Sequence, residues 1–233
     1  MLLAVKFWII VVKLIRKSTK ILTLTFAFKY INICKQKNIY MKPIEIIIFV
    51  VFIIAMFFYL RHLLVTDFTP HPIAFGIWFV ADLINFLTYI DFSKFWIAPA
   101  IMPLGAAIIV VIGIIKRKKN HREKFKRNDL ICIVLVIISL LIWALTRNAI
   151  WSNMIIQIII ALGFVPIIDN ILHEKPEPLF PWFLFIIGWT ITCIYTFIGY
   201  ESVVELIYPF VNGLFGCIVI FIGSWIVIRR RIT

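Results

Sequence analysis

The sequence predicts an all-α polytopic membrane protein, with seven transmembrane helices arranged as two parallel three-helix repeats joined by a linker helix. Three observations lead to this fold class. The 233 residues are 63% hydrophobic with a mean hydropathy of +1.05, whereas ordinary soluble domains are about half apolar. The apolar residues form long segments, and similar residues recur about 110 positions apart. Most of the chain therefore faces lipid rather than water.

The first 43 residues form a basic segment that differs from the rest of the chain. Its two apolar stretches, 2–15 and 21–34, contain lysines and are shorter than the roughly 20 apolar residues that a span needs. No small-residue cleavage site follows, which disfavours a signal peptide. Three interpretations stay open. Met41 is the true start and residues 1–40 are upstream sequence, or they form a basic amphipathic helix on the membrane surface, or they add another crossing.

Seven apolar segments follow, and they set the domain boundaries. About 20 helical residues at 1.5 Å each cross the roughly 30 Å hydrocarbon core. The expected spans are 44–64, 72–91, 95–115, 130–146, 150–172, 179–200 and 203–228. The resulting divisions are a basic segment 1–43, a first repeat 44–115, a basic loop 116–129, a linker helix 130–146, a second repeat 147–228 and a basic tail 229–233.

The two repeats share uncommon residues at nearly one offset. The matching pairs are Pro72 with Pro181, Trp78 with Trp189, Tyr89 with Tyr200, Pro99 with Pro209, and Gly113 with Gly223. A single linker helix between the units gives both the same direction through the membrane, so an axis along the membrane normal relates them. Repeats of this kind place a binding site at their interface near the bilayer midplane.

The net charge of +13 comes from cations that stand between apolar segments. One predicted side carries 13 of them, with eight in the loop 116–129, and the other side, counted from Met41, carries three. The positive-inside rule therefore places loop 116–129 and the C-terminus in the cytoplasm, with the chain in the cell membrane. Because the cations do not form one polar face, no nucleic-acid partner is expected.

Enzyme chemistry is not expected from this sequence. It holds no nucleophile–base pair, phosphate-binding loop or metal-ligand cluster, so we expect neither a catalytic residue, a cofactor nor a metal. The four cysteines show no disulfide or zinc spacing.

Candidate binding residues form a stripe on the second span. Trp78, Asp82 and Asn85 lie on one helical face, and the repeat offset maps the first and third of them onto Trp189 and Thr196. Two such stripes facing a common axis would line a pocket. The alternative is that these faces only pack helix against helix.

Two polar residues within spans carry the most information. Asp82 near a span centre costs about 2.5–3.5 kcal/mol on insertion scales. It is either a proton or cation relay, a hydrogen-bonding group for a solute, or a structural acid bonded to a neighbouring helix. Asn212 lies deep in the last span, followed by Gly213 and Gly216, which permit a helix or a solute to approach closely.

The last span also carries a family resemblance. Seven helices in a 3+1+3 arrangement, with Asn212-Gly213-Leu214-Phe215-Gly216 after Pro209, resemble the PQ-loop and SWEET sugar-transporter superfamily, and the chain is similar to uncharacterised bacterial PQ-loop-like multi-pass membrane proteins. Leu162–Pro166 resembles that family's Pro-Gln helix end, with Ile167 in place of the glutamine. The resemblance covers roughly 44–228. It implies a pocket lined by Asn212, Trp78 and Trp189.

Two functions remain as hypotheses. The first is a uniporter or proton-coupled carrier of a small polar solute, with the residues Trp78, Asp82, Asn85, Trp189, Thr196 and Asn212 at its site. The second is a non-transporting scaffold, receptor or assembly factor with the same fold. Besides the lipid bilayer and the solute, anionic lipid at loop 116–129 is a candidate partner. A monomer and an oligomer both stay open.

Overall fold

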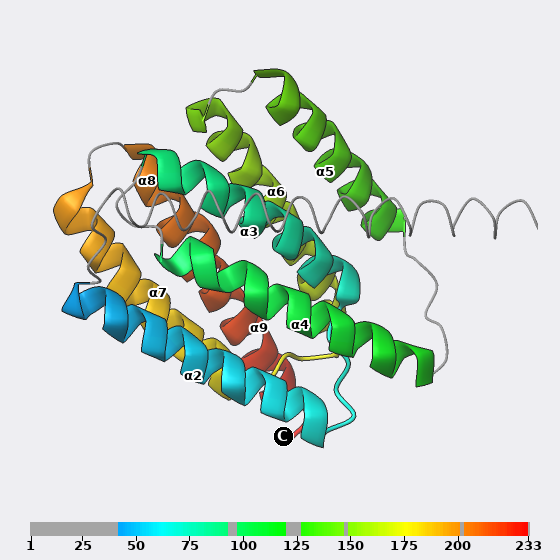
Figure 1. Cartoon of the computed structure of the whole chain (residues 1–233). Coiled ribbons are helices and arrows are strands. Elements are labelled where there is room, and N and C mark those ends of the chain that lie inside the picture. Colours follow the sequence, from blue (N-terminus) through cyan, green and yellow to red (C-terminus); the bar gives the residue numbers. More distant parts are fainter. Residues whose placement is uncertain (1–41, 93–96, 120–126, 147–148, 201–202, 233) are drawn as a thin grey trace, which may run out of the picture. The chain divides into compact units, whose positions relative to one another are not determined.

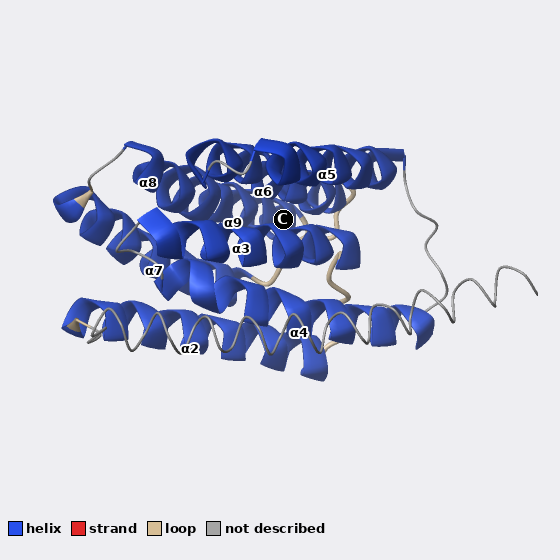
Figure 2. Ribbon diagram, turned by 45° about the horizontal axis from the view of Figure 1, so that its top comes forward, coloured by secondary structure: helices blue, strands red, loops and turns tan. Residues whose placement is uncertain are grey.

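The described residues of the chain are helical. The computed structural model describes residues 42–92, 97–119, 127–146, 149–200 and 203–232, and within these ranges it contains helices, turns and no strand (Figures 1 and 2). Apart from Lys42, they belong to one compact unit, Pro43–Thr233. The predicted basic segment 1–43 lies outside the described residues except for its last two, as does the middle of the predicted loop 116–129.

Each predicted apolar segment corresponds to a helical stretch. The helices are α2 (Pro43–Val65), α3 (Pro72–Phe92), α4 (Ile97–Lys119), α5 (Arg127–Thr146), α6 (Ala149–Leu172), α7 (Leu179–Gly199), α8 (Val203–Ile207), η1 (Tyr208–Phe215) and α9 (Gly216–Arg230). The predicted linker 130–146 is too short at its start, because the helix already begins at Arg127. The last predicted span, 203–228, comprises α8, η1 and α9 in succession.

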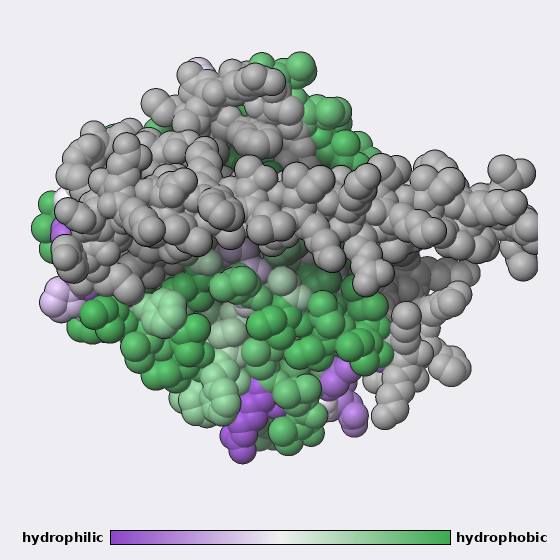
Figure 3. All heavy atoms as spheres, viewed as in Figure 1, coloured by the Kyte–Doolittle hydropathy of each residue, from purple (hydrophilic) through white to green (hydrophobic). Residues whose placement is uncertain are grey.

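The helices have the composition of membrane spans. Within the described residues, four stretches are long and apolar enough to cross a membrane: 43–65, 154–172, 179–199 and 203–230. Two shorter apolar stretches cover 72–86 and 100–116. Large apolar side chains such as Leu104 and Ile198 are exposed on the outside of the bundle, and Figure 3 shows hydrophobic residues over much of the visible described surface. The prediction of an all-α membrane protein is confirmed.

The helices form two trios with the same packing order. In the first trio, α4 packs against both α2 and α3. In the second, η1 and α9 pack against both α6 and α7. Between the trios, α3 packs against α6 and α2 packs against α7, whereas α5 packs mainly along α6 (Figure 1).

One end of the bundle collects cations and two turns. The Lys116 ammonium at the end of α4 donates to the carbonyls of Thr66 and Phe68 in the α2–α3 turn. The Arg231 guanidinium, just after α9, donates to the carbonyl of Glu174 in the α6–α7 turn. We call this end, which includes residues 66–71, 173–178 and 229–231, the basic end.

The last helix is widened where it reaches the centre of the bundle. Residues Tyr208–Phe215 form a π-helix, in which the N–H of Gly216 donates to the carbonyl of Val211 five residues earlier. Pro209 lies in its first turn and has no N–H to donate. Such widened turns occur often at functional sites. This one carries both Tyr208 and Asn212 into the bundle, where they are buried.

Glycines let helices approach each other closely, both between the trios and within the second trio. A Cβ atom at Gly163 of α6 would lie 2.3 Å from Nε1 of Trp78 on α3. A Cβ atom at Gly213 would lie 2.3 Å from the ring of Trp189 on α7. Each of these tryptophans therefore needs a residue without a side chain opposite its ring.

This packing predicts the effect of Gly163→Ala. The added methyl group overpacks the Trp78 contact and should lower the free energy of unfolding by about 1–3 kcal/mol, measured as a lower melting temperature of the purified protein. Gly76→Ala is the matched control, because a Cβ atom there meets nothing within 4 Å. Equal melting temperatures for the two variants would contradict the close approach.

Candidate functional site

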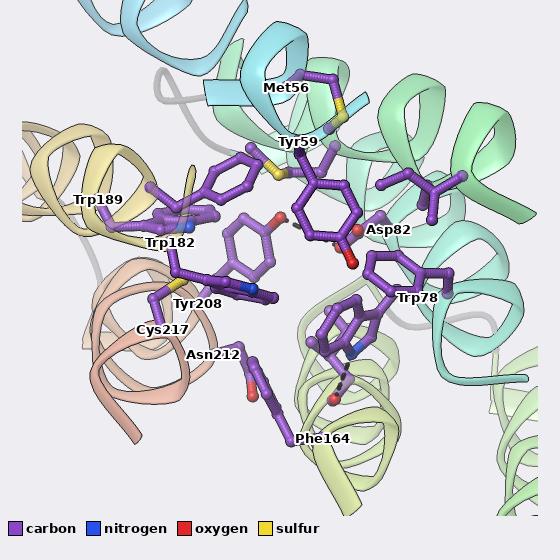
Figure 4. A pocket seen from close by; sticks show the side chains of 16 residues that line it. Met56, Tyr59, Trp78, Asp82, Phe164, Trp182, Trp189, Tyr208, Asn212 and Cys217 are labelled. Carbon is purple, nitrogen blue, oxygen red and sulfur yellow. Dashed lines mark hydrogen bonds between the residues drawn. The ribbon is translucent and has the colours of Figure 1, made fainter. Parts of the chain in front are cut away.

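A cavity of about 70 Å³ lies between the two trios. Since roughly 10–15 Å³ holds one water molecule, it has room for several waters or a small solute. All three helical elements of each trio contribute to its lining, and α5 contributes none. Half of its 16 lining residues are aromatic, so its walls offer flat apolar faces with few polar groups (Figure 4).

Four of the six predicted site residues line this cavity. They are Trp78 and Asp82 from α3, Trp189 from α7, and Asn212 from η1. Asn85 and Thr196 do not line it: both are fully buried, one or two turns further along α3 and α7 from the basic end. The structure thus brings the two predicted stripes to one place, and the binding role of these residues stays a prediction.

The two tryptophans each contact a helix of the other trio. Trp78 donates from Nε1 to the carbonyl of Ile160 on α6 at 3.0 Å, and its ring meets Phe164 edge to face at 4.8 Å. Trp189 meets Phe52 of α2 edge to face at 5.0 Å and Tyr208 at 5.1 Å. These aromatic contacts form the walls of the cavity and join the trios across it.

Asp82 is held by a tyrosine rather than by a cation. The hydroxyl of Tyr208 donates to Oδ1 of Asp82 at 3.2 Å, which links α3 to η1. Among the described residues, no Lys, Arg or His side chain pairs with Asp82, which is 7% exposed. The hydrogen bond fits the structural interpretation of Asp82. Its place on the cavity wall also leaves it able to contact a solute.

An amide network fixes the orientation of Asn212. Its Nδ2 donates to the backbone carbonyl of Gln157 at 3.1 Å and to that residue's Oε1. Gln157 in turn donates from Nε2 to Oδ1 of Asn85 at 3.0 Å. Both hydrogen bonds of Asn212 use its side-chain nitrogen, which leaves the amide oxygen, Oδ1, as the remaining polar atom of the side chain. That Oδ1 is buried and has no donor among the described residues, so one hydrogen-bond acceptor beside the cavity is left unfilled.

A buried carboxylate at the basic end is a group that the sequence did not reveal. Glu177 lies in the turn before α7 and is 2% exposed. Its Oε2 accepts hydrogen bonds from the Tyr59 hydroxyl at 2.8 Å and from Nε1 of Trp182 at 3.2 Å. Both donors line the cavity. The residue stands between two prolines in a polar turn, and no sequence signal separates it from an exposed acid.

Burial controls the protonation of Glu177. Removal from water raises the pKa of this carboxyl to about 7, although the hydrogen bonds from Tyr59 and Trp182 act in the opposite direction. The group therefore changes charge near neutral pH.

The opposite end carries a second carboxylate–tyrosine pair. Tyr195 of α7 donates from its hydroxyl to Oε1 of Glu45 on α2 at 2.9 Å, and Glu45 is 6% exposed. Each end of the α2–α7 contact therefore has one buried carboxylate that accepts from a tyrosine.

Comparison of the chain with protein-family models, curated proteins and solved structures finds no match. Among the described residues, no three His, Cys, Asp or Glu side chains gather in a way that could hold a metal ion.

Glu177→Gln should change how stability depends on pH. In the wild type, the folded carboxyl keeps its proton up to a pKa of about 7, against an ordinary value of 4.5. The contribution of this group to the free energy of unfolding is therefore greatest below pH 4.5 and falls as the pH rises to 7. At about 1.4 kcal/mol per pKa unit, the loss is of the order of 3 kcal/mol. The variant cannot ionise and should melt higher than the wild type at pH 8 but similarly at pH 4.5.

Glu174→Gln serves as the control for this comparison, because Glu174 is exposed in the same turn. We expect it to melt like the wild type at both pH values. A Glu177→Gln variant that gains nothing between pH 4.5 and pH 8 would contradict the burial of this charge.

Proposed function

We propose that the chain is a transporter of a small polar solute, either a uniporter or a proton-coupled carrier, and that the solute binds in the cavity between the trios. One observation carries the proposal: a cavity at the interface of two three-helix units, with walls from both units and with the side chains of Asp82 and Asn212 among its few polar groups. Secondary transporters built from parallel repeats place their sites at such interfaces.

The packing order supports two repeats of one unit. When α2, α3 and α4 are paired with α6, α7 and the final helix, the third member lies between the other two in each trio. The same pairing converts one contact between the trios into the other: α3 with α6 becomes α7 with α2. An axis between the trios would relate them in this way.

The cavity lining follows the same pairing. Trp78 and Trp189, at an offset of 111, both line it, as do Met102 and Asn212 at an offset of 110. Methionine thus stands in the first unit where asparagine stands in the second. These pairs support a PQ-loop or SWEET-like arrangement in which the third helix of only the second unit contributes an asparagine to the site.

The chemistry of the lining favours a solute with hydroxyl or amino groups. The free Oδ1 of Asn212 and the carboxyl of Asp82 accept hydrogen bonds, and the tryptophan faces stack on apolar ring surfaces or attract a cation. We further propose that the chain lies in the cell membrane with its basic end on the cytoplasmic side, because Lys and Arg are enriched in cytoplasmic loops. There the basic residues would also attract anionic lipid.

One observation favours the second candidate, a scaffold or receptor that does not transport. The bonds of Trp78 to α6 and of Gln157 to Asn85 join the trios through buried atoms. Buried bonds of this kind would hold a static bundle together. The two candidates differ in whether a solute binds in the cavity.

A thermal-shift panel separates the candidates. Purified protein is melted with sugars, amino acids and small organic cations. A solute present at 100 times its dissociation constant adds about 2.7 kcal/mol to stability, which raises the melting temperature by several degrees. Asn212→Ala should lose this shift, because it removes the free Oδ1 from the wall.

Thr196→Val is the matched control for the panel. It removes a buried hydroxyl on α7 that does not line the cavity, and we expect it to keep the shift. A folded protein that no solute stabilises, or a shift that survives Asn212→Ala in full, would contradict binding in the cavity.

A further inference from the structure

Glu177 lies at the basic end beside two residues of the cavity wall. Two of the cavity's own side chains, Tyr59 from α2 and Trp182 from α7, donate to a single oxygen of this carboxyl. The backbone N–H of Glu177 donates to Oγ of Ser224 on α9 at 3.0 Å. The turn therefore ties α2, α7 and α9 together beside the cavity, and Figure 4 shows Tyr59 and Trp182 projecting towards it from different helices.

Aromatic rings fill the space between these helices. Tyr59 meets Trp182 edge to face at 6.3 Å and Phe75 at 5.7 Å. Trp182 meets Trp78 at 6.3 Å. Tyr59 is fully buried and Trp182 is 4% exposed. A solute leaving the cavity towards the basic end would have to separate Tyr59 from Trp182, and the oxygen that both share is on Glu177.

No cation balances Glu177 in this closed arrangement. Among the described residues, no Lys, Arg or His pairs with it, and its second oxygen, Oε1, accepts no hydrogen bond. Of the groups packed around it, α2 presents Tyr59, α7 presents Trp182 and α9 presents Ser224, and none of these gains or loses charge near neutral pH. An unpaired buried charge is costly unless water reaches it.

Other titratable groups of the basic end contact different partners. His62, one turn beyond Tyr59 on α2, packs against Phe68. His71 precedes α3, and Lys175 stands in the same turn as Glu177. Arg231 donates to the carbonyl of Glu174. His173, in the same turn as Glu177, lies 3.6 Å from Asp169. His62, His71 and His173 are therefore the side chains whose effects have to be separated from that of Glu177.

We propose that Glu177 is a proton-binding site that controls the opening of the cavity at the basic end. With a proton on Oε1, the neutral acid keeps Oε2 as an acceptor for Tyr59 and Trp182, and the end stays closed. When the O–H bond breaks and the proton passes to water at the basic end, hydration stabilises the carboxylate, and α2 and α7 separate. The inference rests on the proposed transport function and names the coupling ion and its residue.

The direction of the switch follows from linkage. The closed state buries the carboxyl and binds the proton more tightly than an open, hydrated state would. Proton binding therefore favours closure, and a rise in pH favours opening. With a pKa of about 7 in the closed state, against an ordinary value of 4.5, opening becomes more favourable as the pH rises from 4.5 to 7, and the effect levels off near pH 8.

Cys217 provides a native reporter of opening, because it lines the cavity and is 4% exposed. In the test, Cys34, Cys132 and Cys193 are replaced by alanine, and the full chain in lipid nanodiscs is treated with a small charged methanethiosulfonate reagent. The rate of Cys217 labelling is divided by the rate for Glu177→Gln at the same pH, which removes the effect of pH on the thiol itself.

The expected ratio rises about tenfold from pH 6 to pH 8, as the ionised fraction of a group with a pKa near 7 does. Glu177→Gln mimics the protonated acid and stays closed. Glu45→Gln, which alters the carboxylate at the opposite end, should keep the wild-type rise, as should His62→Gln, His71→Gln and His173→Gln. Tyr59→Phe removes a donor from the ionised carboxylate, so it should open further at pH 8.

A ratio that stays flat, or a rise lost in His62→Gln, His71→Gln or His173→Gln, would overturn the assignment to Glu177. If Glu177→Gln does not fold, the Tyr59→Phe and wild-type rates at pH 8 decide, and equal rates count against the proposal. The labelling needs no solute, so its failure leaves the solute panel standing. If Cys217 never reacts in any folded variant, the cavity does not open, and both proposals fail.

Discussion

The structure depends on one constraint: polar groups within lipid must find their partners inside the protein. Here those partners lie across the interface between the trios. Trp78 reaches the backbone of α6, Tyr208 reaches Asp82, and Gln157 reaches Asn85. Because apolar contacts between helices gain little in lipid, these bonds and close ring packing hold the trios together. The same bonds surround the cavity, so stability and candidate function share their residues.

Close approach and polar pairing act together at this interface. Gly163 leaves room for the ring of Trp78 between the trios, and Gly213 leaves room for the ring of Trp189 within the second trio. The π-helix turns Tyr208 and Asn212 inwards. The resulting walls are rigid aromatic surfaces, with the free Oδ1 of Asn212 as a polar exception. At the basic end the lining continues through Tyr59 and Trp182 to Glu177. A conformational change that opens this end would therefore act on a few hydrogen bonds rather than on the whole bundle.

The sequence was informative where one local pattern decides the outcome. Long apolar runs located the helices, and helical spacing together with the repeat offset located Trp78, Asp82 and Trp189, while depth in its span indicated Asn212. The same spacing put Asn85 and Thr196 on these stripes, but the cavity does not extend as far as the helical turns that carry them. Glu177, Tyr59 and Trp182 were missed because their association depends on how a turn folds back over α2. The π-helix was missed because hydropathy does not register a change of helical pitch.

The central claim is that the two trios move apart at the basic end around the cavity. It is tested most directly by distances between spin labels on exposed positions of that end, in a cysteine-free background. Leu64→Cys on α2 and Leu172→Cys on α6 report between the trios, and Leu64→Cys with Ile115→Cys on α4 reports within one. The account predicts a longer distance between trios at pH 8 than at pH 6, with the distance within the trio unchanged. Distance distributions that are the same at pH 6 and pH 8 for both pairs would contradict the account and indicate a static bundle.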